Sequence, residues 1–369
     1  MEIQNESSLL PQRNPIPWRK YSIIFGSSHP ELQEQIEKYL AIKCTSIDVR
    51  TFSNSEIDVR IGENIRNKHA IIIQSPVLDS TKSVNDYIME LYLICNAVKL
   101  SSAKSITCIV PCFPYARSDK KDRSRMCIAA RALCDLISAQ GVNRLVTVDL
   151  HAGQIQGYLN IPFDNLYAMP LFCRVIKKLF LQNDTINDYV LISPDAGSTK
   201  RVNAYARSLK LPVMIFEKQR DYTKVNNVES STLVTQNVNP EGKIAIIVDD
   251  IVDTMGTMVS VINSLAGLGI KQFIIFATHG ILSGEAIERI NSCDLISHVI
   301  VTNTVPVKNK MIGCRKLIQV NIQKLLGDVI KCLITGDTIS EMFKESPLNE
   351  YNYDSIEFDT NKNEINFFY

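Results

Sequence analysis

Residues 243–257, KIAIIVDDIVDTMGT, form the stretch that decides the fold. The apolar run at 244–248 predicts a buried strand, and Asp249 and Asp250 follow at its end. The turn at 253–257 leads into a helix, so its backbone N–H groups can hold a phosphate. Two adjacent carboxylates can accept hydrogen bonds from vicinal sugar hydroxyls. The sequence therefore predicts a sugar phosphate site made of Asp249, Asp250, Asp253, Thr254, Met255, Gly256 and Thr257.

A purely structural role for these aspartates is the alternative. One aspartate at a strand end would be interpreted as a helix cap or as a solvated strand end. Here two aspartates lie between apolar residues, and a third acid precedes a hydroxyl-rich turn with a glycine. The combination exceeds what capping requires, so the pattern favours a ligand site.

Short β-branched apolar runs alternate with amphipathic stretches on both sides of this motif, which predicts an α/β protein. The runs are apolar throughout, as in parallel strands covered by helices on both faces. The alternation occurs twice, so we expect two similar doubly wound domains with mainly parallel sheets. The expected strands are 21–26, 70–75, 105–111, 144–150, 189–193, 212–217, 243–249, 272–278 and 297–302. The expected helices are 30–42, 84–103, 126–140, 169–181, 199–209, 257–267, 284–292 and 321–334.

The two ends of the chain differ from its middle. Residues 1–18 are polar with three prolines and are interpreted as a flexible N-terminal arm. Residues 19–165 and 166–346 are the expected domains, and the second contains the 253–257 turn. Residues 347–369 are rich in Asn, Asp and Glu, which predicts a disordered or loosely docked tail.

The composition fits a globular protein that binds small molecules. The formal net charge of +1 argues against a nucleic-acid surface, and any anion site must be local. No run approaches the ~18 apolar residues that a membrane span needs. No signal peptide is evident at the start, and the 10 cysteines show no CxxC or zinc spacing. We therefore expect a cytoplasmic protein with buried, reduced thiols and with neither nucleic acid nor membrane as a partner.

Charged side chains follow other expected strands. His151 and Asp195 each come after an apolar run and could share one divalent cation with phosphate oxygens. A hydrogen-bonded structural histidine remains the alternative at 151. Lys218 and Arg220 are two residues apart on a strand, so they point the same way and could neutralise a phosphoryl group. A solvated charge pair remains the alternative there.

One aromatic and two polar residues alternate in a short segment of the N-terminal half of the chain. Phe52, Asn54 and Glu56 alternate along FSNSE, so an extended segment would present them on one side. An aromatic ring with amide and carboxylate groups can hold a purine.

Several of these segments resemble a known family. VDDIVDTMGT at 248–257 is similar to the motif that binds phosphoribosyl pyrophosphate (PRPP) in the type I phosphoribosyltransferase fold, which phosphoribosyltransferases and PRPP synthetases share. Further segments resemble the PRPP synthetases, or ribose-phosphate pyrophosphokinases, in particular. They are FSNSE (52–56), PCFPYARSDKKDRSR (111–125), DLHAGQIQGY (149–158), SPDAG (193–197), EKQR (217–220) and THGILSG (278–284). Together the matches cover about residues 20–346 in order.

The resemblance implies an enzyme that transfers the β,γ-diphosphate of ATP to the 1-hydroxyl of ribose 5-phosphate, with AMP leaving. It implies Mg²⁺ on His151 and Asp195, and catalytic roles for Lys218 and Arg220. It implies ATP binding by Phe52, Asn54, Glu56, Arg117, Asp122 and His151. It also implies that residues 249–250 and 253–257 bind ribose 5-phosphate.

The resemblance extends to assembly and regulation. Family members are commonly hexamers built from dimers, and the adenine segment serves the active site of a neighbouring subunit. We therefore expect a homo-oligomer. Phosphate and ADP regulate part of the family, and the matching positions are Arg66, Ser102, Lys121, Arg125 and Ser340.

Two other functions are considered beside this interpretation, and one residue departs from the family pattern. A catalytically silent regulatory paralogue would be expected to lose the phosphate loop or the Lys218 and Arg220 pair, and both are present. A phosphoribosyltransferase would not be expected to carry the ATP segments. Ser118 follows PYAR where the family usually has glutamine, so its shorter hydroxyl puts one ATP contact in doubt.

Overall fold

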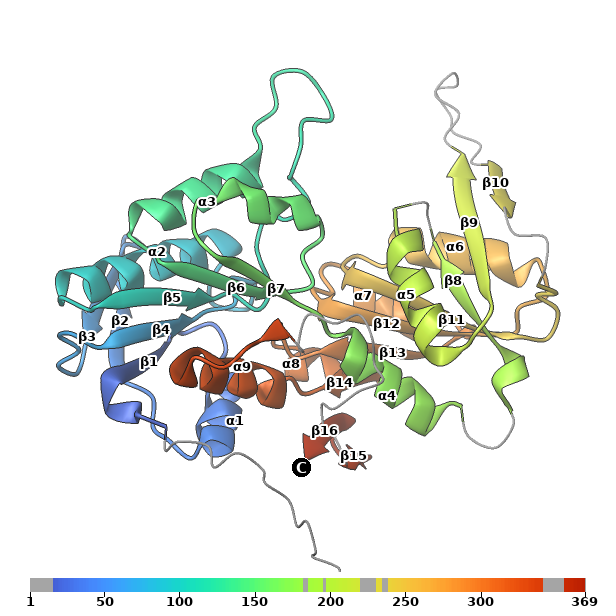
Figure 1. Ribbon diagram of the computed structural model, residues 1–369. Coiled ribbons are helices and arrows are strands. Elements are labelled where there is room, and N and C mark those ends of the chain that lie inside the picture. The colour runs from blue at the N-terminus through green and yellow to red at the C-terminus, as the bar shows by residue number, and fades with distance from the viewer. Residues whose placement is uncertain are drawn as a thin grey trace, which may run out of the picture.

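The computed structural model describes residues 16–181, 185–194, 197–219, 230–233, 238–340 and 355–368. Two large sheets with helices packed against them make up this part of the chain (Figure 1). The N-terminal domain is coloured blue to green, and most of the C-terminal domain is yellow to red. The expected α/β class with mainly parallel sheets is confirmed.

The sheet of the N-terminal domain has the strand order β1-β4-β5-β6-β7, and all its neighbouring strands are parallel. The strands are β1 (Tyr21–Phe25), β4 (His69–Ile73), β5 (Ser105–Ile109), β6 (Arg144–Val148) and β7 (Phe163–Leu166). The helices are α1 (Pro30–Leu40), α2 (Val84–Leu100), α3 (Ala129–Ala139) and the 3-10 helices η1 (Trp18–Lys20) and η2 (Gly153–Tyr158). Successive strand residues face opposite ways. Ile24 belongs to the core cluster with α2 and α3, whereas Ile23 belongs to the cluster with α1. Helices thus cover both faces.

The sheet of the C-terminal domain has the order β10-β9-β8-β11-β12-β13-β14-β16-β15. Its strands are β8 (Tyr189–Ser193), β9 (Val213–Gln219), β10 (Ser230–Leu233), β11 (Ile244–Val252), β12 (Gln272–Gly280), β13 (Ile296–Thr302), β14 (Leu317–Val320), β15 (Ser355–Asp359) and β16 (Glu364–Phe368). Its helices are α4 (Met169–Leu179), η3 (Thr185–Asp188), α5 (Thr199–Leu209), α6 (Gly256–Ala266), α7 (Ala286–Ser292), α8 (Lys308–Met311) and α9 (Gln323–Thr335). Ile246 shares a core cluster with α4, α5 and α9, and Ile247 shares one with α6 and α7.

The two domains share a core. The cluster that holds Ile23 and Leu32 of the first domain also holds Ile246 and Leu325 of the second. At the edge of this contact the hydroxyl of Tyr39 on α1 donates a hydrogen bond of 2.5 Å to Asp328 on α9. The strand ends of the two sheets are therefore fixed relative to each other by apolar packing.

The hairpin of β2 (Ile47–Thr51) and β3 (Ile57–Ile61) was not among the expected strands. Every residue of both strands is at least partly exposed, so they lack the continuous apolar run that marks a buried strand. The boundary between the domains also differs slightly, because β7 continues to Leu166.

The tail differs more from expectation. Within 347–369, residues 355–368 form the hairpin β15–β16, and β16 pairs in parallel with β14. Ile365 and Phe367 are 0% and 3% exposed and belong to the shared core. Of the two expected alternatives, a disordered or a loosely docked tail, the structure shows docking for this hairpin, because alternate apolar side chains on β16 reach the core.

No helix among the described residues is long and apolar enough to span a bilayer. All ten cysteines are free thiols, and six of them are buried, which agrees with their interpretation as small apolar core residues.

Candidate active site

Strand ends from the two sheets meet at one place. His151 follows β6 of the first sheet, and its Nδ1 lies 2.8 Å from Oδ2 of Asp250 on β11 of the second. Asp249 and Asp250 were expected just after their strand, but β11 runs on to Val252. The structure thus brings the predicted histidine and the predicted carboxylate pair into direct contact across the domains.

Arg201 on α5 completes this group, and no sequence motif had indicated it. Its Nη1 donates to Oδ1 of Asp249 at 3.0 Å and to Oδ1 of Asp250 at 2.8 Å. The amphipathic pattern of 199–209 predicted only the helix that carries it. A charged side chain on a helix pairs with groups on the strand that lies beside the helix. The sequence does not show which strand that is.

The four charged groups influence one another's protonation. Burial alone would raise the pKa of Asp250, but the hydrogen bond from His151 and the charge of Arg201 together hold it well below its usual range. Burial and the neighbouring charge of Asp250 raise the pKa of Asp249 to about 7. The hydrogen bond to Asp250 raises the pKa of His151 despite partial burial. Asp250 is thus the carboxylate that stays ionised.

The turn at 253–257, which was expected to bind phosphate, leads directly into α6. Met255 has a left-handed φ of 63°, and α6 begins at Gly256 with the free N–H groups of a helix start. A Cβ on Gly256 would lie 2.8 Å from Nη1 of Arg289, which donates to the carbonyl of Thr254 at 2.9 Å. A larger residue at this position would require the Arg289 guanidinium to move. The expected loop is confirmed as the connection between β11 and α6.

Asp253 joins this loop to the first domain. Nη1 of Arg117 donates to its Oδ2 at 2.9 Å, and the hydroxyl of Ser283 donates to Oδ1. The residue expected to bind triphosphate therefore contacts the residue that opens the ribose phosphate loop.

A cavity of about 740 Å³ lies beside this group. Four predicted site residues line it, namely Arg117, Asp122, His151 and Asp249. Lys120, Lys200 and Arg201 also line it and add positive charge suited to phosphates. Asp149 lies in its wall, where Oδ2 accepts hydrogen bonds from the Thr278 hydroxyl at 2.6 Å and the Ala168 N–H at 3.0 Å.

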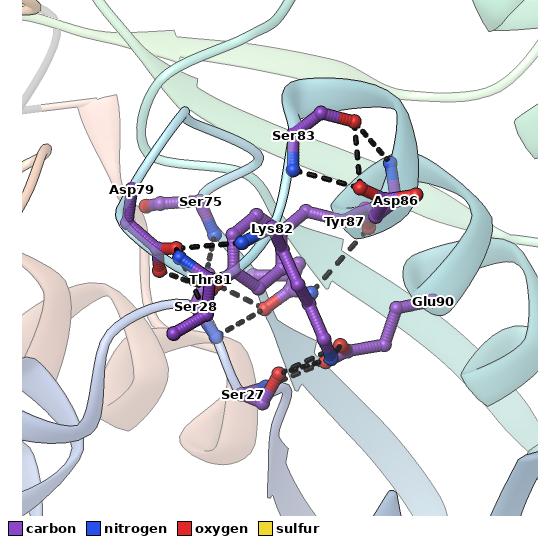
Figure 2. A network of polar contacts seen from close by, with 11 residues as sticks. Ser27, Ser28, Ser75, Asp79, Thr81, Lys82, Ser83, Asp86, Tyr87 and Glu90 are labelled. Carbon is purple, nitrogen blue, oxygen red and sulfur yellow. Dashed lines mark hydrogen bonds and ion pairs between the residues drawn. The ribbon is translucent and has the colours of Figure 1, made fainter. Parts of the chain in front are cut away.

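The opposite part of the first sheet is closed instead. At the ends of β1 and β4, the fully buried Glu90 accepts hydrogen bonds from Ser27, Gln74 and Lys82, as Figure 2 shows for Ser27 and Lys82. Ser28 donates to Gln74 in the same network. These polar groups bond one another rather than facing the cavity beside His151.

The adenine segment is placed differently from expectation. Phe52, Asn54 and Glu56 lie at the turn between β2 and β3, where Ser55 has a left-handed φ of 70°. The interpretation of 52–56 as an extended segment is therefore wrong. The Phe52 ring is 55% exposed, and none of the three is among the described residues that line the cavity.

Other expected residues fall partly outside the described chain. The backbone of Lys218 lies in β9 opposite Ser231, whereas Asp195 and Arg220 lie outside the described residues. Ser118 accepts the N–H of Ala129 on its hydroxyl at 3.4 Å, at the start of α3. Its side chain thus serves the fold locally.

The expected regulatory residues occupy separate parts of the chain. The Asn67 N–H donates to the carbonyl of Ser102 at 2.9 Å, which places Ser102 beside the loop of Arg66. Lys121 and Arg125 lie in the exposed segment between β5 and α3, and the Ser340 N–H donates to Thr338 after α9. Among the described residues no hydrogen bond or ion pair joins these three groups.

Of the two residues expected to hold a divalent cation, His151 lies among the described residues and Asp195 does not. Within the described ranges no cluster of three or more His, Cys, Asp and Glu side chains could hold a metal unaided. Nδ1 of His151 is engaged by Asp250, which leaves Nε2 as its ligand atom. Mg²⁺ commonly binds through one or two carboxylates together with substrate phosphates and waters, so a cation beside His151 would need oxygen ligands from bound phosphates.

Comparisons with known proteins agree with the geometry. A family model for the N-terminal domain of ribose phosphate pyrophosphokinase matches residues 21–141, and one for the phosphoribosyl synthetase-associated domain matches residues 228–344. Ribose-phosphate pyrophosphokinase 2 of Schizosaccharomyces pombe is 41% identical over 325 residues, 88% of this chain and 98% of that protein. The crystal structure of phosphoribosylpyrophosphate synthetase from Mycobacterium smegmatis is 36% identical, with a TM-score of 0.77, and the match covers 86% of this chain and 99% of that one.

Proposed function

The chain belongs to the ribose-phosphate pyrophosphokinase family, and on that premise we propose how its residues divide the reaction. The protein is an enzyme of PRPP synthesis. In our proposal it transfers the β,γ-diphosphate of ATP to the 1-hydroxyl of ribose 5-phosphate and releases AMP. The observation that carries the proposal is the His151–Asp250–Arg201–Asp249 group, which joins the two domains between a phosphate loop and a polar cavity.

Ribose 5-phosphate is held at the end of β11. Its vicinal hydroxyls donate to Asp249 and Asp250, and its phosphate accepts from the loop 253–257. The free N–H groups at the start of α6 and the Thr254 and Thr257 hydroxyls supply the donors. The sugar is thereby oriented with its 1-hydroxyl towards the cavity.

ATP occupies the cavity with its triphosphate near Arg117 and Asp122, and its adenine contacts Phe52, Asn54 and Glu56 of a neighbouring subunit. His151 and Asp195 would hold Mg²⁺, which supplies charge neutralisation on the phosphates when bound. Lys218 and Arg220 neutralise the charge that develops on the transferred group. Such transfers depend on positioning and charge, so no nucleophile and base pair is needed.

The adenine segment supports a homo-oligomer. Phe52 is exposed on a hairpin away from its own cavity, which suits contact with a second subunit. We propose a hexamer built from dimers, in the cytoplasm, with phosphate activation at Arg66, Ser102, Lys121, Arg125 and Ser340. Equal activity with and without inorganic phosphate, in a buffer free of phosphate, would remove the regulatory part of the proposal.

AMP formation tests the proposed reaction. The purified protein is incubated with ATP, Mg²⁺ and phosphate, with or without ribose 5-phosphate, and AMP is measured by chromatography. We expect AMP only with the sugar phosphate, and its loss in Lys218→Ala but not in the exposed-site control Lys271→Ala. Absence of AMP from folded, oligomeric protein would favour the silent regulatory paralogue.

A further inference from the structure

Arg201 is a half-buried cation whose role the proposed reaction leaves open. It lies on α5, which follows β8, and β8 is the parallel neighbour of β11 in the sheet. This neighbourhood places the guanidinium beside the β11 residues Asp249 and Asp250. Only 27% of the Arg201 side chain is exposed, and it also lines the cavity.

One nitrogen of Arg201 bonds both carboxylates. Nη1 lies 3.0 Å from Oδ1 of Asp249 and 2.8 Å from Oδ1 of Asp250. Successive residues of a strand normally point to opposite faces. The shared donor, together with the Asp250 N–H that donates to Oδ1 of Asp249 at 2.9 Å, brings the two Oδ1 atoms towards one point. The relative position of the two carboxylates therefore depends on Arg201.

The two carboxylates do not depend on Arg201 equally. Asp250 is 5% exposed in its side chain and also bonds His151, so its position has a second support. Asp249 is 23% exposed and lines the cavity, where a ligand can reach it. Arg201 is the cation that bonds Asp249 among the described ion pairs. Loss of Arg201 should consequently disturb the carboxylate that faces the ligand.

We infer that Arg201 is a positioning residue that sets the spacing and orientation of Asp249 and Asp250 for the vicinal hydroxyls of ribose 5-phosphate. This inference rests on the proposed function, because it takes the carboxylate pair as the sugar site. A vicinal diol requires two acceptors at a fixed separation, and a planar guanidinium that bonds both carboxylates fixes that separation. Lysine carries the same charge on a compact, strongly hydrated ammonium and lacks the planar group that holds Nη1 between the two carboxylates.

A structural ion pair is the competing explanation. Removing one partner of a buried pair destabilises a fold because a charge is left uncompensated. The two roles differ in what they change. A purely structural role lowers the thermal midpoint and leaves the KM values of the remaining folded enzyme alone, whereas a positioning role raises the KM for one substrate.

The experiment compares wild type, Arg201→Lys and the exposed α5 control Arg207→Gln in steady-state kinetics and thermal unfolding. We expect Arg201→Lys to raise the KM for ribose 5-phosphate about 10-fold to 100-fold, the range for one charge-assisted hydrogen bond. The KM for ATP should change by less than about 3-fold, and Arg207→Gln should leave both KM values unchanged. An unchanged KM for ribose 5-phosphate, or an equal rise for both substrates, would overturn the inference.

A double-mutant cycle tests the same inference at equilibrium, without turnover. Isothermal titration with ribose 5-phosphate is carried out on wild type, Arg201→Gln, Asp249→Asn and the double variant. We expect the loss of affinity from Arg201→Gln to shrink when Asp249 is already Asn, because Arg201 acts through that carboxylate. Additive losses would overturn the inference. Wild-type protein that binds ribose 5-phosphate without turnover would contradict the proposed reaction but leave this cycle valid, and wild type that does not bind it would contradict both.

Discussion

Protonation of His29 should weaken the start of α1, which lies at the contact between the domains. His29 is 2% exposed and is the N-cap of α1. Its Nδ1 accepts the Leu32 N–H at 3.3 Å, so the proton is on Nε2, which donates to the Asn303 carbonyl of the second domain at 2.9 Å. A second proton on Nδ1 would face the Leu32 N–H, and the cap would be lost.

The magnitude follows from the shift in its pKa. Burial lowers the pKa of His29 from 6.5 to about 4. The hydrogen bond to Asn303 opposes this shift, and the positive charge of Lys308 adds to it. The folded pKa lies below the unfolded one, so this stabilisation is present above pH 6.5 and is lost as the pH falls towards 4. Between pH 7 and pH 5 the linkage relation gives a loss of about 2 kcal/mol in the free energy of unfolding.

Urea unfolding of wild type and His29→Asn at both pH values measures this loss. Asparagine is a good N-cap and does not titrate, so the variant retains the helix start while removing the pH-dependent part. We expect the wild type to lose about 2 kcal/mol more than the variant between pH 7 and pH 5. Equal losses in the two proteins would refute the reasoning, because another group would then account for the pH dependence.

Two further pairs of substitutions test the docking of the tail hairpin and the buried network around Glu90. Phe367→Ala should lower the free energy of unfolding by up to about 3–5 kcal/mol, and by no more than the free energy with which the hairpin docks. Glu357→Ala, on the exposed face of β15, should change the free energy of unfolding by less than about 0.5 kcal/mol. Similar small effects from both substitutions would mean that β15–β16 is not docked. Lys82→Met should destabilise the protein more than Glu90→Gln, because Glu90 is 0% exposed in its side chain and would be left without a cation, whereas Lys82 at 17% exposure can turn to solvent. Chemical denaturation ranks the second pair, and the opposite order would contradict this reading of the network.

The fold was predictable where one physical signal dominated. Apolar runs such as 244–248 and 272–278 identified the central strands, because a strand buried on both faces must be apolar throughout. The half-exposed β2 and β3 lacked that signal. In the tail, polar composition outweighed the alternation of Ile365 and Phe367, which decides the docking of β16.

The residues of the candidate site also fall into those that the sequence indicated and those that it did not. The carboxylate pair, the 253–257 turn and His151 could be chosen as candidates because each follows an apolar run of the sequence, and strand ends gather ligands in such folds. Arg201 was missed because its contact with Asp249 depends on strand order. The segment 52–56 was expected to be extended, but the left-handed conformation of Ser55 turns it back between β2 and β3. The sequence did not indicate this conformation, so the direction of the Phe52 side chain was not predictable.

The fate of the diphosphate tests the central claim most directly. Protein is incubated with ATP, Mg²⁺ and ribose 5-phosphate, and the products are followed by ³¹P NMR. The account predicts that AMP and a ribose phosphate with an intact diphosphate on its 1-oxygen appear in equal amounts, and that neither forms with Asp250→Asn. Formation of ADP with a singly phosphorylated sugar, or no product from protein that binds both substrates, would contradict it.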